Sequence, residues 1–151
     1  MIKNRYSPQK RSRKSLNDLI RLYEINYFKL IKLLPIDKIN EEFNFLIPEG
    51  INNSEIRISI NRISLHTSKL NLYKSNLLRY IEDTRMEIFI YHDARMAEVR
   101  RFNGKRQFWL RNKYPNKNML TKDEKFQWNI FLSEFLSHSE LHGLSIVENM
   151  N

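Results

Sequence analysis

The 151-residue chain has no cysteine, three glycines and four prolines, and no run of apolar residues approaches the ~18 residues that cross a bilayer. Without cysteine there can be no disulfides, thiolate metal ligands or cysteine nucleophiles, which fits a reducing compartment. No apolar core follows the basic N-terminal residues, so we expect no secretion signal. The expected location is therefore the cytoplasm, with no membrane partner.

The shortage of glycine excludes several enzyme classes. Gly50, Gly104 and Gly143 are far apart, so neither a G-x-G-x-x-G fingerprint nor a P-loop can be built from them. The G-x-S-x-G elbow of serine hydrolases is also missing. We therefore expect neither a nucleotide-dependent dehydrogenase nor an NTPase, and no bound cofactor.

Positive charge is concentrated in two segments of a chain whose net charge is +9. Residues 1–14 hold six basic side chains and no acid, and residues 95–125 hold ten basic and three acidic side chains. Such segments attract phosphates or acidic partners. The same charge can follow from a composition rich in Lys, Asn and Ile. We expect residues 1–14 to form a flexible basic arm.

A first helix is predicted between Ser15, a favourable N-cap, and Pro35, which cannot continue the hydrogen-bond ladder. Apolar residues recur there at steps of three and four, which places them on one face. The positions on this face are Leu16, Leu19, Ile20, Tyr23, Tyr27, Leu30, Ile31 and Leu34.

The middle of the chain alternates apolar and polar residues, as half-buried strands do. The strongest example is SEIRISIN, which directs Ile56, Ile58 and Ile60 inward. Further strands are predicted in EFNFLIP (42–48), KLNLY (69–73), MEIFIY (86–91) and RMAEVRRF (95–102). Asn103-Gly104 predicts a tight hairpin turn, because both residues tolerate positive φ.

A second helix is predicted from Thr121, which forms a T-x-x-E capping box with Glu124. Its buried stripe comprises Trp128, Phe131, Leu132, Phe135 and Leu136, and His142-Gly143 is a natural stop. The fold class is therefore α+β, with an antiparallel sheet of five or six strands flanked by an N-terminal and a C-terminal helix. We expect residues 15–146 to form a single domain.

Several motifs together resemble a known family. They are RY (5–6), LYEINYFKLIKLLP (22–35), YHDARMAEV (91–99), YPNK (114–117), DEKFQ (123–127) with FL (131–132), and HG (142–143). In order and spacing they are similar to the YqiB-like family of short proteobacterial proteins, a domain of unknown function. The resemblance implies no established activity. The matching positions are Glu24, Asn26, Tyr91, His92, Asp93, Glu98, Tyr114, Pro115, Asn116, Lys117, Asp123, Glu124, Lys125, Gln127 and His142.

The adjacent pair His92-Asp93 allows three interpretations. Between two strands, Asp93 is favoured in a turn because its carboxylate accepts backbone hydrogen bonds, and His92 can bond across the hairpin. The pair could instead contact a ligand, or act as an acid and base, although no neighbouring motif supplies a nucleophile. His138 and His142 share a helix face, but a zinc site needs a third ligand. We therefore expect no metal.

Two basic segments are candidate binding regions. In YPNK, Tyr114-Pro115 favours extended backbone and Asn116 favours a turn. Lys117 and Lys125 flank the predicted start of the second helix, and a helix start attracts anions. KRQFWLRNKY (105–114) interleaves basic and aromatic residues. This pattern is typical of proteins that bind single-stranded nucleic acid, and it is also typical of amphipathic strands.

The leading hypothesis is a non-enzymatic binding or regulatory accessory module with an unidentified protein partner. Its predicted binding residues are His92, Asp93, Glu98, Tyr114, Asn116, Lys117 and Lys125. The first alternative is nucleic-acid binding, with RNA as the main candidate, through the basic arm and residues 100–117. The second alternative is a metal-assisted hydrolase that uses His92 and Asp93.

Overall fold

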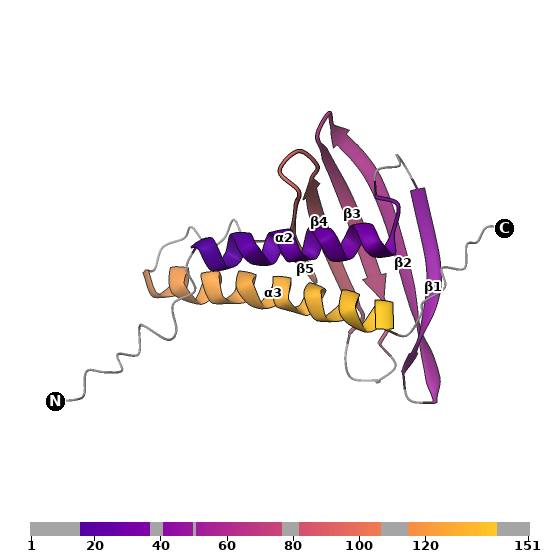
Figure 1. The fold of residues 1–151 in the computed structure, drawn as a ribbon. Coiled ribbons are helices and arrows are strands. Elements are labelled where there is room, and N and C mark those ends of the chain that lie inside the picture. The colour runs from indigo at the N-terminus through magenta and orange to yellow at the C-terminus, as the bar shows by residue number, and fades with distance from the viewer. Residues whose placement is uncertain (1–15, 37–40, 50, 77–81, 107–114, 142–151) are drawn as a thin grey trace.

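The computed structural model describes residues 16–36, 41–49, 51–76, 82–106 and 115–141. Helix α2 (Leu16–Leu33) precedes the strands and helix α3 (Pro115–Leu141) follows them (Figure 1). The strands are β1 (Glu41–Glu49), β2 (Asn52–Ser64), β3 (Thr67–Lys74), β4 (Thr84–Tyr91), β5 (Met96–Phe102) and β6 (Lys105–Arg106). The predicted arm, residues 1–14, lies outside the described residues.

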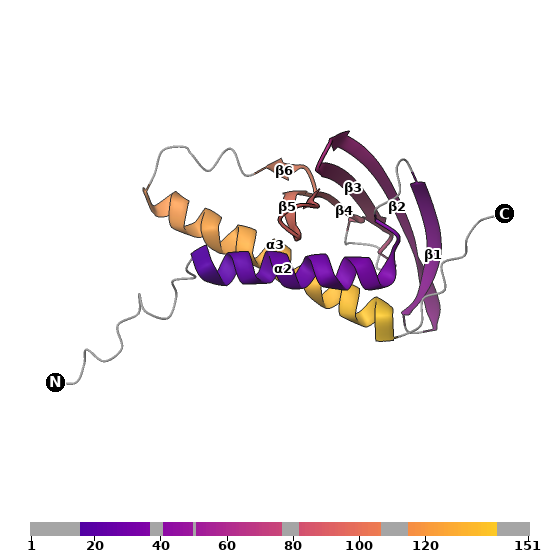
Figure 2. The ribbon, with the colours of Figure 1, turned by 45° about the horizontal axis from the view of Figure 1, so that its top comes forward.

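The described strands form one antiparallel sheet in the order of the chain, β1 to β6. Both helices lie against the same face of this sheet, as Figures 1 and 2 show from two directions. The opposite face carries no described helix, and we call it the open face. The predicted α+β class is confirmed. Neither described helix contains a stretch long and apolar enough to cross a bilayer.

The core lies between the sheet and the two helices. Strand β4 alternates strictly between buried and partly exposed positions, and Met86, Ile88 and Ile90 point inward. The predicted inward residues Ile56, Ile58 and Ile60 of β2 are buried as well. Each such side chain contributes about 1.5–3 kcal/mol when fully buried. The alternation in the sequence therefore reports correctly which side of each strand faces the helices.

Helix α2 begins and ends where the sequence predicts, but its buried stripe is narrower. Tyr23, Asn26 and Leu30 face the core. The predicted stripe members Leu16 and Ile31 are instead 69% and 42% exposed. Successive helical residues are about 100° apart, so Ile31 points well away from its buried neighbour Leu30.

Helix α3 starts six residues before the predicted capping box. It begins at Pro115, so the predicted N-cap Thr121 lies inside the helix and the predicted turn at Asn116 is helical. Proline is compatible with this start because the first helical residues need no N–H donor and its fixed φ suits them. The predicted buried stripe is confirmed for Trp128, Leu132, Phe135 and Leu136, whereas Phe131 is 37% exposed.

The predicted Asn103-Gly104 turn joins β5 to β6. Its φ angles are 48° at Asn103 and 85° at Gly104, both in the left-handed region that this turn requires. The Asn103 side chain also accepts a hydrogen bond of 2.8 Å from the N–H of Arg85. The turn is thereby tied to the start of β4. The rest of the predicted hairpin, residues 107–114, lies outside the described residues.

Two buried asparagines join the helices to strand β5. The N–H of Val99 donates to Oδ1 of Asn129 at 2.9 Å, and Nδ2 of Asn26 donates to the carbonyl of Asn129 at 3.1 Å. Both asparagines are fully buried. Among the described residues, β6 pairs with Arg101 and Phe102 and does not reach Val99, so Asn129 supplies the acceptor that a neighbouring strand would otherwise provide there.

Candidate functional site

The structure places His92 and Asp93 in the turn between β4 and β5, as the sequence predicts. Nε2 of His92 lies 2.8 Å from Oγ of Ser68, and the His92 N–H donates to the carbonyl of His66 at 2.8 Å. These contacts tie the turn to β3. Asp93 is exposed, whereas Ser68 is only 1% exposed, so its hydroxyl group is not accessible to a substrate. The geometry favours the interpretation of His92 as a residue that anchors the turn.

The predicted residues Glu98 and Lys125 meet each other. Lys125 Nζ lies 2.5 Å from Oε2 of Glu98, and the Tyr91 hydroxyl donates to Oε1 at 2.8 Å. The Tyr23 hydroxyl of α2 donates to Oε2 at 3.4 Å. We call these four residues the Glu98 cluster. It joins both helices to β5, and the Lys125 and Glu98 side chains are only 19% and 13% exposed. Their polar groups are thus used inside the fold.

The tyrosines of the Glu98 cluster make stability depend on pH. Burial, followed by the charge of Glu98, raises the pKa of Tyr23 and also that of Tyr91. A tyrosine whose pKa is higher in the folded than in the unfolded chain contributes its full stabilisation below about pH 10, the ordinary pKa of tyrosine. This contribution is lost as the pH rises above that value. Between about pH 9 and pH 11, the urea-derived free energy of unfolding should fall by about 1 kcal/mol less in Y23F than in the wild type. Equal losses would contradict this assignment.

The remaining predicted residues do not complete one surface. Tyr114 lies outside the described residues, and Asn116 and Lys117 belong to the first turn of α3, with side chains outside the described part. Figure 1 shows the start of α3 well apart from the turn between β4 and β5. Binding by the predicted set through a protein partner therefore stays a prediction.

A metal centre gains no support from the described side chains. Among them, no three His, Asp or Glu residues gather closely enough to hold an ion. His138 lies near Thr84 and Asn103, at the opposite end of β4 from the His92 turn. His142 is outside the described residues.

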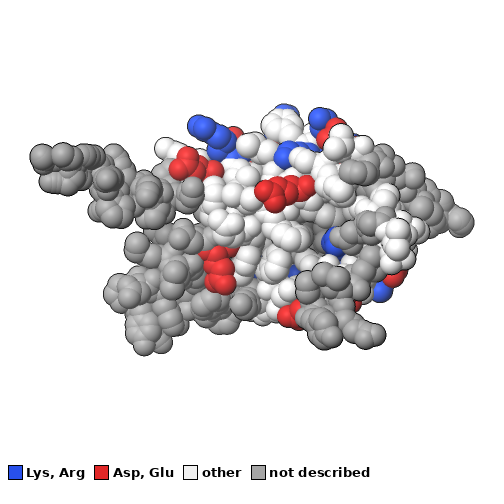
Figure 3. All heavy atoms as spheres, turned by 90° about the horizontal axis from the view of Figure 1, so that it is seen from below, with Lys and Arg blue, Asp and Glu red and all other residues white. Residues whose placement is uncertain are grey.

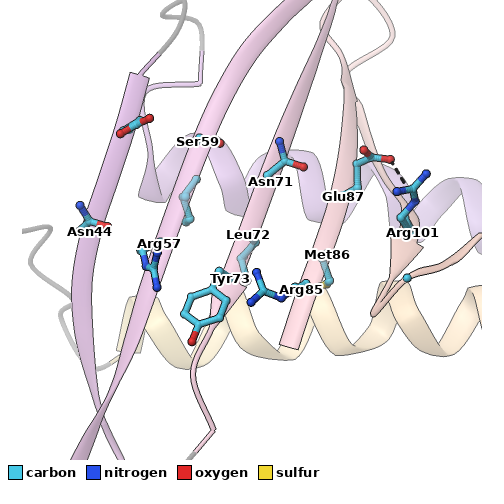
Figure 4. A pocket seen from close by; sticks show the side chains of 13 residues that line it. Asn44, Arg57, Ser59, Asn71, Leu72, Tyr73, Arg85, Met86, Glu87 and Arg101 are labelled. Atoms are coloured by element: carbon cyan, nitrogen blue, oxygen red, sulfur yellow. Dashed lines mark ion pairs between the residues drawn. The ribbon is translucent and has the colours of Figure 1, made fainter. Parts of the chain in front are cut away.

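The open face of the sheet carries a groove of about 610 Å³ (Figure 4). Its first row of side chains follows the strand register, because Asn44 pairs with Arg57, Arg57 with Tyr73, and Tyr73 with Arg85. We call these four residues the arginine row. They come from β1, β2, β3 and β4 in turn, and they point away from the helices.

The arginine row holds two guanidinium groups beside one ring. Cζ of Arg57 lies 4.4 Å and Cζ of Arg85 lies 4.7 Å from the centroid of Tyr73, distances typical of cation–π contacts. The Tyr73 hydroxyl donates to Oδ2 of Asp83 at 2.6 Å. This hydrogen bond holds the pKa of the Asp83 carboxyl below its ordinary value and raises the pKa of Tyr73. The ring is thus held by its hydroxyl group and lies close to both guanidinium groups.

A second row crosses the groove beside the first. The register places Glu42, Ser59, Asn71, Glu87 and Arg101 next to one another. Ser59 and Asn71 in this row are neutral and able to donate hydrogen bonds. The Glu87 carboxylate lies 3.2 Å from Lys69 Nζ and 3.9 Å from Arg101 Nε. Its charge is therefore balanced within the sheet.

The local sequence does not predict the groove. Alternation in β2 does place Arg57 and Ser59 outward, which was one available signal. It does not show that Tyr73 and Arg85, from other strands, stand beside Arg57. The sequence also offered a signal for the buried roles of Asn26 and Asn129, because each is a polar residue within an apolar helical stripe.

The fold and the groove define an α+β protein with an open antiparallel sheet backed by two helices. The chain belongs to the family described as "Protein of unknown function (DUF1249)", whose model matches residues 29–145. It is 30% identical over 127 residues to "Uncharacterized protein YqiB" of Escherichia coli K12 and of Escherichia coli O157:H7, covering 83% of this chain and 89% of each relative. The predicted family is confirmed. No solved structure is significantly similar to the chain.

Proposed function

We propose that the protein is a non-enzymatic binding module that holds an anionic group in the open-face groove. The observation that carries this proposal is the arginine row, in which Tyr73 holds the guanidinium groups of Arg57 and Arg85 close to its ring. Guanidinium groups bind carboxylates and phosphates with two parallel hydrogen bonds. Prior ordering of the two side chains lowers the entropic cost of binding.

The neighbouring side chains suit an anion. Asn71 and Ser59 offer neutral donors beside the two arginines, and within the described residues no carboxylate forms an ion pair with Arg85. Arg57 is shared with Glu55, whose Oε2 lies 3.2 Å from its Nε. Both members of this pair are about half exposed, so the contact is weak and easily exchanged for a ligand.

The lining of the groove supports binding rather than catalysis. None of the described residues that line it is a histidine, so the Ser59 hydroxyl has no imidazole to activate it there. The absence of cysteine fits the proposed cytoplasmic location.

The proposal is tested by an NMR titration of the full chain with inorganic pyrophosphate. Backbone amides near Arg57, Tyr73 and Arg85 should shift, and the double variant R57Q/R85Q should bind about tenfold more weakly, because each lost guanidinium removes a charge-assisted hydrogen bond.

The matched control is R21Q, which removes an exposed arginine from α2 on the other side of the sheet. It should bind pyrophosphate like the wild type. Shifts confined to other parts of the chain, or equal weakening in R21Q and R57Q/R85Q, would refute the groove as the site.

A further inference from the structure

A second contact between an arginine and an aromatic ring lies on the same side of β4 as Arg85, next to the Glu98 cluster. Cζ of Arg100 lies 4.7 Å from the ring centroid of Phe89, and Nη1 of Arg100 donates to the Tyr91 hydroxyl at 3.5 Å. The rings of Phe89 and Tyr91 are 6.4 Å apart between centroids. Both rings are half-buried, so part of each meets solvent. This second contact has the same chemistry as the arginine row.

The two contacts are separated along one strand. Phe89 follows Arg85 by four residues on β4, on the same face, which places it about 13 Å away at the rise of a strand. This span exceeds a single phosphate or carboxylate group. A ligand that uses both contacts must be extended and must present repeated anionic and flat apolar groups.

Three acidic side chains on this side of the sheet form ion pairs. Glu87 lies near Lys69 and Arg101, and Glu98 is bonded to Lys125. The remaining pairs are Glu55 with Arg57 and Asp83 with the Tyr73 hydroxyl, while Glu42 lines the groove from the β1 edge. Glu87 and Glu55 are thus paired with cations, whereas Asp83 and Glu42 keep their negative charge beside the groove.

We propose that the extended ligand is a single-stranded nucleic acid, with phosphates at Arg57 and Arg85 and an unpaired base against Phe89. The inference rests on the proposed function and names its ligand class. Single strands are bound by basic grooves combined with aromatic side chains, and sheets that read RNA do so with aromatic residues on an open face. Bases also stack on guanidinium planes, such as those of the arginine row.

The surface differs from the segment that the sequence suggested. Of residues 100–117, those at 107–114 lie outside the described part, as does the basic arm. Figure 3 views the side on which α3 lies in Figure 1, and there the described Lys and Arg are scattered among acidic and uncharged side chains. A gathered set of arginines and aromatic rings is found instead on the open face.

The test is fluorescence anisotropy with the full chain and labelled oligonucleotides of about 12 nucleotides, namely oligo(U) RNA, oligo(dU) DNA and an RNA duplex. Single strands should bind more tightly than the duplex, and affinity should fall between about 50 and 200 mM salt. R57Q/R85Q should weaken binding about tenfold and reduce the slope against salt by about 0.7 for each lost phosphate contact. The RNA and DNA probes show whether the 2′-hydroxyl contributes.

A second variant separates stacking from charge. F89A should weaken binding about tenfold with an unchanged salt slope, because a base stack carries no ionic charge. R21Q should bind like the wild type, and the melting temperatures of all variants should be compared to exclude unfolding. A full-chain variant in which the Lys and Arg of residues 1–14 are replaced by Gln measures how much the arm contributes to oligonucleotide binding.

The outcomes distinguish the two proposals. Pyrophosphate binding in the groove without oligonucleotide binding would overturn this inference and leave the proposed function standing. Oligonucleotide binding that survives R57Q/R85Q and F89A, but is lost in the arm variant, would also overturn it. If the wild-type protein binds neither pyrophosphate nor the oligonucleotides, both proposals are refuted.

Discussion

Replacing Asn129 by alanine is expected to lower the free energy of unfolding by about 2 kcal/mol. The substitution removes the acceptor for the N–H of Val99 and the donor to the carbonyl of Lys125, which Nδ2 reaches at 2.9 Å. Asn129 is fully buried, so water cannot replace either partner without opening the contact between α3 and β5. A buried N–H left unpaired costs about 1–3 kcal/mol.

Urea unfolding and amide hydrogen exchange together check this expectation. Exchange at Val99 should accelerate more than exchange in the middle of β2, because the edge of β5 opens first. The control is Q127A, an exposed change on the same helix, which should shift stability by no more than about 0.5 kcal/mol. If N129A and Q127A are equally stable, Asn129 does not close the sheet edge.

The second large effect is expected at Glu98. E98A should lower the free energy of unfolding by about 2–3 kcal/mol, because it leaves the Lys125 ammonium and the Tyr91 hydroxyl without their acceptor. Lys125 keeps some access to water, which holds the cost below that of a fully buried charge. E98Q retains an oxygen for Tyr91 and should cost less, about 1 kcal/mol.

A double-mutant cycle isolates the pair. E98A/K125A should be less destabilised than the sum of the single variants by about 1 kcal/mol or more, since removing both partners leaves no unpaired charge. E134A, an exposed acid on α3, is the matched control and should have little effect. Strict additivity of E98A and K125A would show that the two side chains do not stabilise each other.

Neither the role of Asn129 nor the pairing of Glu98 with Lys125 was predicted from the sequence. Glu98 and Lys125 were expected to bind a partner, and their pairing inside the fold is a tertiary result. Asn129 was not singled out, although Trp128 and Leu132 beside it were correctly predicted as buried. A helical stripe identifies which face is covered, but it does not show that a strand edge needs an acceptor there.

The start of α3 shows a different kind of limit. Thr121 and Glu124 match a capping box, yet the helix already begins at Pro115. Both signals are local and compatible with a helix N-terminus. The choice between them depends on energies over many residues, which a short motif does not contain.

Local sequence determined the α+β class, the inward residues of the strands and the turn at Asn103-Gly104. These features follow from periods of two and 3.6 residues and from the φ preferences of single residues, so neighbours in the chain are sufficient to predict them. Only the tertiary structure decided that Arg57, Tyr73 and Arg85 form one row. Such a row requires the register of three separate strands, and a shift of one residue would turn any of these side chains to the other face.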